Sequence, residues 1–432
     1  MKKALLFATG FILYGVLMWY YLLHGAHTEL PIQYRGSAAD PTMFMNGRQL
    51  KLSYDFSRLK DWIYFVSVPL EWLIYLLVLG FGLSKKMRSA VKGITRFSLV
   101  HTGLYVLLLS FGSWLLTFPL RYYSYTVSRD YHISVQLFKG WMKDSLIDFW
   151  VGWLFTFLTV VVIYFFIRKA KKKWWLYAWL ISIPFTIFMY FIQPVVIDPL
   201  YNKFYPLKDQ ALKEKILTLA DRAEIPASNV YEVNMSEKTN SLNAYVNGIG
   251  SNLRIVLWDT TLDRLNDKQV LFVMAHEMGH YVMNHLYQNL IGAIILTLFG
   301  LFLGSKVYTW ALAKWGKRWG IKGPGDIAGL PVLLLIFSLL SFLAGPVENA
   351  VSRKAEKDAD RYAIEMTKDP EAAVGAFQKL TISGLSEVNP PKLVKFFLYG
   401  HPTMLERITF LDSYKDKYQP KELQNAKQQK QQ

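Results

Sequence analysis

The stretch "VMAHEMGHYVMNH", residues 273–285, places two histidines four residues apart with a glutamate beside the first. On a helix, positions i and i+4 lie on one face, so His276 and His280 can direct their ring nitrogens at one ion. Hydrolytic zinc sites use three protein ligands and keep a fourth position for water. Glu277 lies where it can take a proton from that water. The pattern H-E-x-x-H therefore predicts a hydrolytic zinc site, although two histidines on a buried helix can also be purely structural.

A third ligand is expected in "ENAVSRKAEKDADRYA", residues 348–363, because the chain has no cysteine and any metal must be held by His, Asp or Glu. On a helix, Glu356 can complete the set of ligands. Asp360, one turn later, can accept a hydrogen bond from the far ring nitrogen of His276. A solvent-exposed charged helix would show the same letters, but the two stretches complement each other and favour one Zn²⁺ per chain. His285 breaks the i, i+4 spacing and is interpreted as structural.

Composition indicates a membrane protein. Of the 432 residues, 52% are hydrophobic and 16% aromatic, and the mean hydropathy is +0.18, which is high for a soluble domain of this size. A helix needs roughly 20 apolar residues to cross a bilayer. The first apolar run ends in bulky aromatic residues, which favours a retained helix over a cleaved signal peptide. The sequence predicts spans at residues 4–23, 62–83, 97–119, 147–167, 174–197, 287–305 and 327–346.

Between the fifth and sixth predicted spans the chain is less apolar and its periodicity is mixed. Residues 211–225 show helical spacing, residues 230–235 are typical of a strand, and residues 241–259 predict two strands around a Gly-rich turn. Asn266, with Gln269 three positions later, predicts a helix start. The helix that follows carries H-E-x-x-H and can continue into the sixth span.

Several motifs, in this order along the chain, resemble those of the Ste24 group of M48 metalloproteases, whose best-known members are the type 1 CAAX prenyl proteases. They are IDPLYNKFYPL (197–207), NAYVNGIGSNLRIVLWDTTL (243–262), HEMGH (276–280), SRKAEKDAD (352–360) and GHPTMLERITFL (400–411). The membrane half matches only in layout, since its seven apolar runs fit the family count. The resemblance covers nearly the whole chain.

The resemblance implies further site residues. Asn243 and Ala244 would lie on an edge strand that pairs with substrate backbone, as an unpaired strand edge can. His401 would point into the cleft and stabilise the oxyanion that forms on the scissile carbonyl. Arg407 would support His401 or the oxyanion. In this family the membrane helices enclose a large chamber, which would limit access to short or unfolded chains.

The expected fold is a multi-pass α-helical membrane protein, with about seven transmembrane helices, that carries a zincin-like α+β zinc metalloprotease domain split around the last two helices. We expect a five-helix membrane domain at 1–197 and the first part of the peptidase domain at 198–286. Helices six and seven then occupy 287–346, the second part of the peptidase domain occupies 347–418, and a disordered tail occupies 419–432.

The net charge of +17 is explained by lysines and arginines at helix ends beside anionic headgroups, and no motif indicates nucleic-acid binding. The connections 85–96, 168–173 and 306–325 carry five Lys or Arg residues each. By the positive-inside rule these loops are cytoplasmic and the zinc site faces outward. The eukaryotic members of the resembled family are described with the zinc domain facing the cytosol, so the sequence leaves the side of the zinc site open.

Other functions were weighed against the protease. Seven spans permit a transporter or channel, but few charged residues lie within them to mark an ion path. A di-iron bundle needs a second E-x-x-H, which the sequence lacks. An inactive scaffold is disfavoured because His276, Glu277, His280 and Glu356 are all present.

The substrate is a peptide or protein whose identity the sequence leaves open. Processing of a prenylated CAAX end follows only from the resemblance. The short N-terminus and the absence of cysteine favour a bacterial chain, in which clearance of short or membrane-associated peptides is expected instead. We expect an integral protein of a bacterial cell membrane. The sequence leaves its oligomeric state open, and a monomer would suffice.

Overall fold

The computed structural model describes residues 2–94, 97–227, 229–248 and 253–418, with only the backbone described for residues 2–5. Within these ranges, six apolar helical segments are long enough to cross a membrane. One segment, Phe138–Tyr201, contains two helices that pack against each other and are separated by a turn at Lys171–Lys173. Counting both helices gives seven, as predicted. The seven are α1 (Lys2–Tyr20), α2 (Gly47–Gly80), α4 (Ser98–Asp130), α5 (Phe138–Ala170), α6 (Trp174–Ile192), α11 (His285–Trp319) and α12 (Leu330–Thr367).

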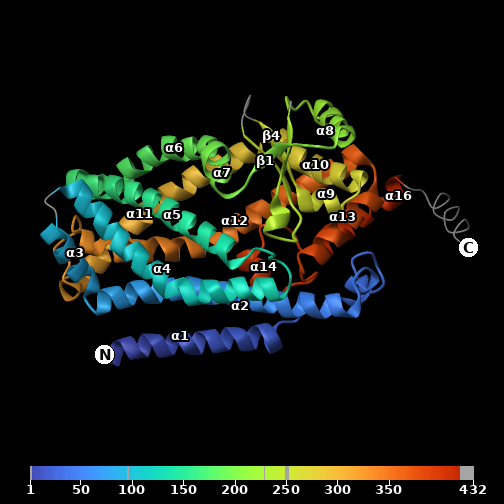
Figure 1. The fold of residues 1–432 in the computed structure, drawn as a ribbon. Coiled ribbons are helices and arrows are strands. Elements are labelled where there is room, and N and C mark those ends of the chain that lie inside the picture. Colours follow the sequence, from blue (N-terminus) through green and yellow to red (C-terminus); the bar gives the residue numbers. More distant parts are fainter. Residues whose placement is uncertain (1, 95–96, 228, 249–252, 419–432) are drawn as a thin grey trace, which may run out of the picture.

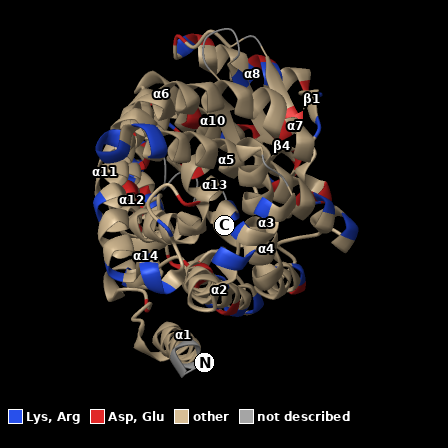
Figure 2. Ribbon diagram, turned by 90° about the vertical axis from the view of Figure 1, so that its left-hand side faces the viewer, with Lys and Arg blue, Asp and Glu red and all other residues tan. Residues whose placement is uncertain are grey.

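Six of these helices close a circle. α2 packs on α4, α4 on α5, α5 on α6, α6 on α11, α11 on α12, and α12 returns to α2. α1 packs on α2 and lies apart from the other helices in both views (Figures 1 and 2). Each helix of the circle therefore has one face directed outward and one directed inward. The chamber that the resemblance implies stays a prediction.

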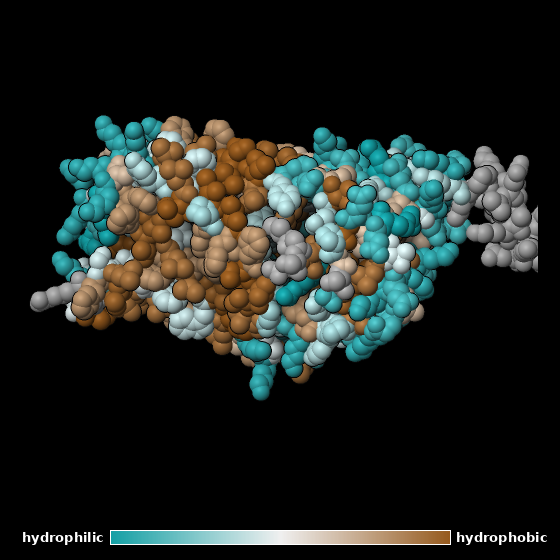
Figure 3. Space-filling model, turned by 90° about the horizontal axis from the view of Figure 1, so that it is seen from above, coloured by the Kyte–Doolittle hydropathy of each residue, from teal (hydrophilic) through white to brown (hydrophobic). Residues whose placement is uncertain are grey.

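The membrane part has a basic end that lies away from the part that contains the β-strands. The N-terminus, α3 (Leu83–Ile94), the α5–α6 turn and the end of α11 gather at the left of Figure 1. Figure 2 views the molecule from this end, where blue Lys and Arg segments lie around the circle of helices. Figure 3 shows a band of hydrophobic side chains between this end and the hydrophilic opposite end. The band is the surface expected to lie in the hydrocarbon core.

The hydrophilic part contains, among the described residues, a four-stranded sheet in the order β1-β2-β4-β3. β2 runs parallel to β4, while β1 pairs with β2, and β3 with β4, in antiparallel fashion. The predicted strands are thus present, and β3 lies at an edge of the sheet; the tip of the predicted turn, 249–252, falls outside the described residues. The strands are β1 (Phe204–Pro206), β2 (Val230–Val233), β3 (Ala244–Asn247) and β4 (Arg254–Trp258).

Segments on either side of the last two membrane helices share one hydrophobic core. Ile216 and Phe272 from the first segment lie in the same buried cluster as Ala363 and Ile408 from the second. The other helices outside the membrane spans are α7 (Asp198–Tyr201), α8 (Gln210–Arg222), α9 (Asp259–Arg264), α10 (Asp267–Val282), α13 (Pro370–Ser383), α14 (Lys392–Leu398), α15 (Met404–Asp412) and α16 (Lys415–Tyr418), of which α8, α9 and α10 pack on the sheet. Two stretches more than 70 residues apart in sequence are thereby fixed relative to each other.

The helix that carries H-E-x-x-H does not continue into the membrane. α10 ends at Val282, Asn284 adopts a left-handed conformation with φ of 57°, and α11 begins at His285. Asparagine is one of the few residues that accept this conformation readily. The break separates the metal-binding helix from the sixth span and turns His285 back toward His280. The predicted tail, 419–432, lies outside the described residues.

Candidate metal centre

α10 positions the two histidines. Its first turn is closed by a capping box, in which Asn266 accepts from the backbone N–H of Gln269 and the Gln269 side chain accepts from that of Asn266. Gly279 lets α12 approach closely, since a Cβ there would lie 3.1 Å from the Tyr362 ring. One turn apart on the buried face, the Nε2 atoms of His276 and His280 are 3.2 Å from each other.

Glu356 of α12 closes the triangle. Its Oε2 is 3.2 Å from His276 Nε2, and its Oε1 is 3.3 Å from His280 Nε2. A tetrahedral zinc ion with bonds of about 2.0–2.1 Å separates its ligand atoms by roughly 3.3 Å. Glu356 Oε2 is also buried and accepts no hydrogen bond from the described residues. The donor set, its spacing and this unmatched oxygen all fit a zinc ion.

Asp360 and Arg407 fix the first of these histidines. His276 Nδ1 lies 2.9 Å from Asp360 Oδ1, and only 1% of the Asp360 side chain is exposed. Arg407 donates two hydrogen bonds to Asp360, from Nε at 2.8 Å and from Nη2 at 2.6 Å. Arg407 Nη2 also lies 3.4 Å from His276 Nδ1, and no described hydrogen bond joins Arg407 to His401. The predicted role of Arg407 beside His401 or the oxyanion stays a prediction, whereas its contacts are those of a residue that orients Asp360.

His280 has a partner that sequence reasoning missed. Its Nδ1 lies 2.9 Å from Nδ1 of His285, which is buried. The spacing of five residues suggested that His285 points away from the metal-binding face, but the left-handed Asn284 ends α10 and brings the ring back. A ring nitrogen that faces away from a metal usually has such a partner. In the sequence, the Asn284-His285 pair shortly after α10 is the signal that could have indicated this contact.

The electrostatics of the site favour bound positive charge. Burial alone would lower the pKa of His276, but the Asp360 and Glu356 carboxylates beside the ring outweigh burial and raise this pKa to about 9. A divalent cation in place of the proton would satisfy the same carboxylates. Burial also raises the pKa of the Glu277 carboxyl above its usual range, although the two histidines oppose the shift. A carboxyl group shifted in this direction is better matched to general base catalysis near neutral pH.

His401 lies on the open side of the triangle. Its Nε2 is 3.3 Å from Glu356 Oε1, and 63% of its side chain is exposed. It is held by the segment between α14 and α15, where Arg353 donates a hydrogen bond of 2.7 Å to the carbonyl of Tyr399. An imidazole placed beside the third ligand and open to solvent can reach a carbonyl oxygen at the metal.

Ala244 begins the edge strand β3, and Asn243 directly precedes it. The backbone N–H of Asn243 donates to Thr261 Oγ1 of α9, and its carbonyl accepts from the N–H of Trp258 in β4, so both groups are turned toward the β4 side. Backbone groups alternate along an antiparallel strand, which turns those of Ala244 to the opposite edge. The Asn243 side chain accepts from the Ala244 N–H at 2.9 Å. The Ala244 carbonyl is thus directed to the side where an extended peptide could pair.

These residues meet in one cleft of about 420 Å³, lined by Asn243, Ala244, His276, Glu277, His401 and Arg407 together with further polar and apolar neighbours. His280 and Glu356 complete the metal triangle behind it. The arrangement combines a metal triad, a carboxyl base, an exposed imidazole and a strand edge, which are the parts needed to hydrolyse a peptide bond at a metal ion.

Comparisons with known proteins agree with this geometry. The family model of peptidase family M48 matches residues 206–415, and the model described as CAAX prenyl protease N-terminal, five membrane helices, matches residues 26–203. The metalloprotease YhfN of Bacillus subtilis is 48% identical over 399 residues, which are 92% of this chain and 94% of that protein. CAAX prenyl protease 1 of Saccharomyces cerevisiae is 27% identical over 425 residues, covering 91% and 90%.

A solved structure supports the fold. The crystal structure of S. mikatae Ste24p superposes with a TM-score of 0.76 at 24% identity and covers 95% of this chain and 97% of that one. At this identity the likeness concerns the fold alone, and it confirms the predicted multi-pass helical architecture with a zincin-like part. With two family models matched in order and a relative 48% identical over nearly its whole length, the chain belongs to peptidase family M48 and is a membrane zinc metalloprotease.

Proposed function

We propose that His276, His280 and Glu356 hold one Zn²⁺ and that the protein cleaves extended peptides in the cleft beside it. The observation that carries this proposal is the convergence of the ligand atoms: the Nε2 atoms of His276 and His280 are 3.2 Å apart, and they lie 3.2 and 3.3 Å from Oε2 and Oε1 of Glu356, respectively. Asp360 fixes the orientation and tautomer of His276, because it lies at Nδ1 and leaves Nε2 for the metal. Arg407 holds Asp360 in place, and His285 does the same for His280.

The side chains around the metal have separate tasks. When bound, zinc polarises the scissile carbonyl and lowers the pKa of water. Glu277 takes the proton from the attacking water and passes it to the leaving amine, a role that its raised pKa supports. His401 donates a hydrogen bond to the carbonyl oxygen as negative charge develops there. Ala244 pairs with the substrate backbone and holds it extended across the site.

The substrates we propose are short or membrane-associated peptides. Several relatives carry the name CAAX prenyl protease 1, which makes a CAAX end one candidate for this chain, whereas the relative at 48% identity is named only as a metalloprotease. A cleft that opens beside a circle of membrane helices suits an extended chain at the membrane surface better than a folded protein.

We also propose that the zinc site faces the outer side of a bacterial cell membrane. The bacterial relative supports the compartment, and the basic end, opposite the peptidase part, supports the orientation by the positive-inside rule. Because the chain has no cysteine, one can be introduced at Asp263, and another at Lys317 as its counterpart. A membrane-impermeant thiol reagent on intact cells should label Asp263→Cys and not Lys317→Cys, whereas the reverse pattern would place the zinc site in the cytoplasm.

The protease proposal is tested by zinc content and cleavage of a quenched peptide by purified wild type and Glu277→Gln. We expect about one zinc ion in both proteins and a loss of cleavage of about 10²–10⁴-fold in the variant, because the general base is absent. Glu365→Gln, at an exposed position on α12, is the matched control and should cleave normally. A wild type without zinc, or equal cleavage by Glu277→Gln, would overturn the proposal.

A further inference from the structure

His401 lies on a connection that belongs to no helix or strand. This connection, the His401 segment, consists of residues 399–403 and joins α14 to α15. The Nε2 atom of His401 is 3.3 Å from Oε1 of Glu356, yet 63% of the side chain is exposed. A donor stabilises developing charge well only when it is in place before the reaction. Because most of the His401 side chain faces solvent, its position depends on how the backbone of the His401 segment is held.

Two side chains of α12 hold the His401 segment. Asn349 Nδ2 donates to the carbonyl of Phe397 at 2.8 Å. Arg353 Nη1 donates to the carbonyl of Tyr399 at 2.7 Å and to that of Lys395 at 3.4 Å. The last four carbonyls of a helix have no partner within it, so α12 supplies donors where α14 ends. The described hydrogen bonds of the Arg353 guanidinium go to these backbone carbonyls alone.

The backbone next to His401 rests on the same helix. A Cβ atom at Gly400 would lie 3.3 Å from Ser352 Oγ and 3.7 Å from Asn349 Oδ1. The first distance is shorter than most contacts of a Cβ atom, so a larger residue at this position would press on α12. The His401 segment therefore contacts α12 through its backbone as well as through the two donor side chains.

The residues of α12 that make these contacts lie on one stripe with a metal ligand. Positions i, i+3, i+4 and i+7 share one face of a helix. These positions are occupied by Asn349, Ser352, Arg353 and Glu356. The side chains that hold the His401 segment thus belong to the same face of the same helix as the third ligand. This arrangement fixes His401 relative to Glu356.

The far end of the His401 segment is held by α15. A capping box closes the first turn of α15: the Thr403 side chain accepts from the backbone N–H of Glu406, and the Glu406 side chain accepts from that of Thr403. Glu406 Oε1 also pairs with Lys395 Nζ of α14. These contacts shape the connection between the two helices but involve none of the three metal ligands.

We propose that Asn349 and Arg353 are positioning residues for His401. They keep the imidazole beside the metal centre, where it donates to the oxyanion in the transition state. This inference rests on the proposed function and deepens it, because it names the contacts on which the role of His401 depends. Neither residue is among the described residues that line the cleft. Both therefore act through His401 and take no part in the chemical step.

The test measures kcat and KM for a quenched peptide, together with the zinc content of each variant. His401→Ala should lower kcat by about 10²–10³-fold, as the loss of an oxyanion donor does. Arg353→Met should lower kcat by about 10- to 100-fold, because a displacement of about 1 Å can have an effect of this size. KM and zinc content should change little, since the lost contact belongs to the transition state. Arg353→Lys, which retains a donor, should restore part of the rate.

The same change in a protein without His401 separates positioning from a purely structural role. In the His401→Ala background, Arg353→Met should lower kcat by less than about twofold further, because two changes that remove one interaction are not additive. A purely structural role would give the same loss in both backgrounds. Asn349→Ala removes a donor, whereas Gly400→Ala pushes the backbone away from α12. Both should lower kcat with the same dependence on His401.

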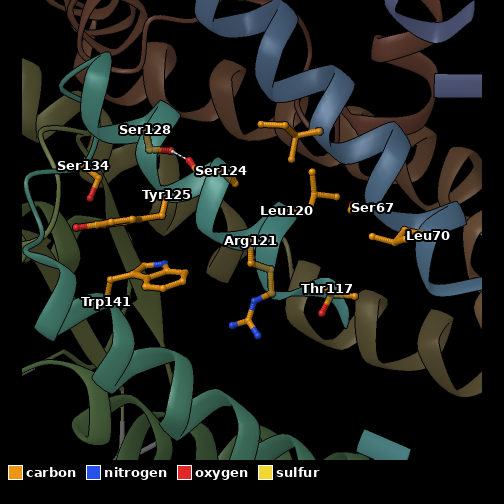
Figure 4. A pocket seen from close by; sticks show the side chains of 11 residues that line it. Ser67, Leu70, Thr117, Leu120, Arg121, Ser124, Tyr125, Ser128, Ser134 and Trp141 are labelled. Atoms are coloured by element: carbon orange, nitrogen blue, oxygen red, sulfur yellow. Dashed lines mark hydrogen bonds between the residues drawn. The ribbon is translucent and has the colours of Figure 1, made fainter. Parts of the chain in front are cut away.

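Two control variants leave the His401 segment untouched. Lys354→Met lies at an exposed position next to Arg353 on α12. Ser128→Ala removes a hydrogen bond of the same kind, from a side chain to the carbonyl of Ser124 at 2.9 Å, in a separate cavity between α2, α4 and α5 (Figure 4). That cavity has no described lining residue in common with the cleft. Both variants should cleave at the wild-type rate.

Cleavage by Arg353→Met at the wild-type rate, or an equal loss in both backgrounds, would overturn the inference. If Arg353→Met does not fold, Asn349→Ala and Gly400→Ala supply the same comparison. The proposed function can fail separately. Wild-type cleavage by His401→Ala would refute the proposed role of His401 itself, and the inference with it. Slow cleavage by His401→Ala together with normal cleavage by Arg353→Met would overturn the positioning alone.

Discussion

Two buried ion pairs flank the cleft and differ in how completely their polar atoms are matched. Arg407 donates twice to Asp360, and its guanidinium lies 4.1 Å from the centre of the Phe377 ring. Arg58 Nη2 donates to Glu387 at 3.0 Å and to Thr28 Oγ1 at 2.8 Å, and its guanidinium lies 4.7 Å from the centre of the Tyr54 ring, but its Nε and Nη1 have no hydrogen-bond partner among the described residues. Both arginines are buried. Burial of opposite charges therefore does not by itself mean a strong pair.

The difference follows from the cost of removing charges from water. Attraction offsets that cost only when the geometry is good and the remaining donors and acceptors are satisfied. At Arg407 both conditions hold, and the pair keeps Asp360 ionised beside His276. At Arg58 the cost prevails: burial raises the pKa of Glu387 to about 7, although the charge of Arg58 opposes the shift. Buried polar atoms without a hydrogen-bond partner thus do not identify a metal site by themselves. A metal site also needs several His, Asp or Glu side chains whose ligand atoms converge on one point.

The largest effect is expected at the well-matched pair. Arg407→Met leaves Asp360 ionised and buried with only His276 beside it, and removing one partner of a buried pair costs about 3–5 kcal/mol. Thermal unfolding in detergent with bound zinc should show this loss, together with weaker zinc retention. Arg361→Met, at an exposed position on α12, is the control and should change stability little. Equal stability of the two variants would mean that the Arg407 pair contributes no more than a surface charge.

The Arg58–Glu387 pair should make the stability of the protein depend on pH. The pKa of Glu387 in the folded protein, about 7, lies above the usual value of 4.5, so the folded state favours the protonated carboxyl. The resulting stability is fully present below pH 4.5 and is lost as pH rises through 7, at up to about 1.4 kcal/mol per pH unit. Glu387→Gln stays neutral, so its melting temperature should depend less on pH between about 4.5 and 7 than that of wild type. An unchanged pH profile would show that the Arg58 pair is as well matched as the Arg407 pair.

The next effect concerns zinc affinity. Asp360→Asn keeps the shape and one acceptor at His276 Nδ1 but removes the charge, whereas Asp360→Ala removes both. Partners of metal-bound histidines typically contribute 10- to 100-fold in affinity, so we expect about a tenfold loss for the Asn variant and about a hundredfold loss for the Ala variant in a chelator competition. Asp358→Asn, two residues earlier on α12, is the matched control. If both Asp360 variants hold zinc as tightly as wild type, orientation of His276 by Asp360 is not needed.

The sequence predicted those features that depend on local spacing. The seven spans follow from hydrophobic runs, the start of α10 from Asn266 and Gln269, and the two histidines on one face from their separation by four. The convergence of His276 with Glu356 needed complementarity between two stretches, because no local rule joins residues 80 positions apart. β1 was not predicted, since a strand of three residues ending in proline shows no alternation.

Features that depend on long-range packing were beyond such reasoning. The partner of Arg407 could not be read from the motif around it, because the two hydrogen bonds cross from α15 to α12. Closure of the helices into a circle likewise depends on contacts between distant segments. The role of His285 was missed for a local reason, namely a single left-handed residue that reverses the direction of the chain.

The smallest effect on zinc affinity is expected at His285, and it allows the two histidine ligands to be compared with each other. His276 is oriented by a carboxylate that is itself held by Arg407, whereas His280 is oriented by the neutral partner His285 through one hydrogen bond. A neutral hydrogen bond contributes about 0.5–1.5 kcal/mol, so His285→Ala should weaken zinc binding by only about two- to tenfold. His285→Asn, which offers a side-chain donor and acceptor, should restore part of the loss in the same chelator competition. A loss from His285→Ala as large as that from Asp360→Ala would mean that the metal centre depends equally on both orienting contacts, and that charge is not what separates them.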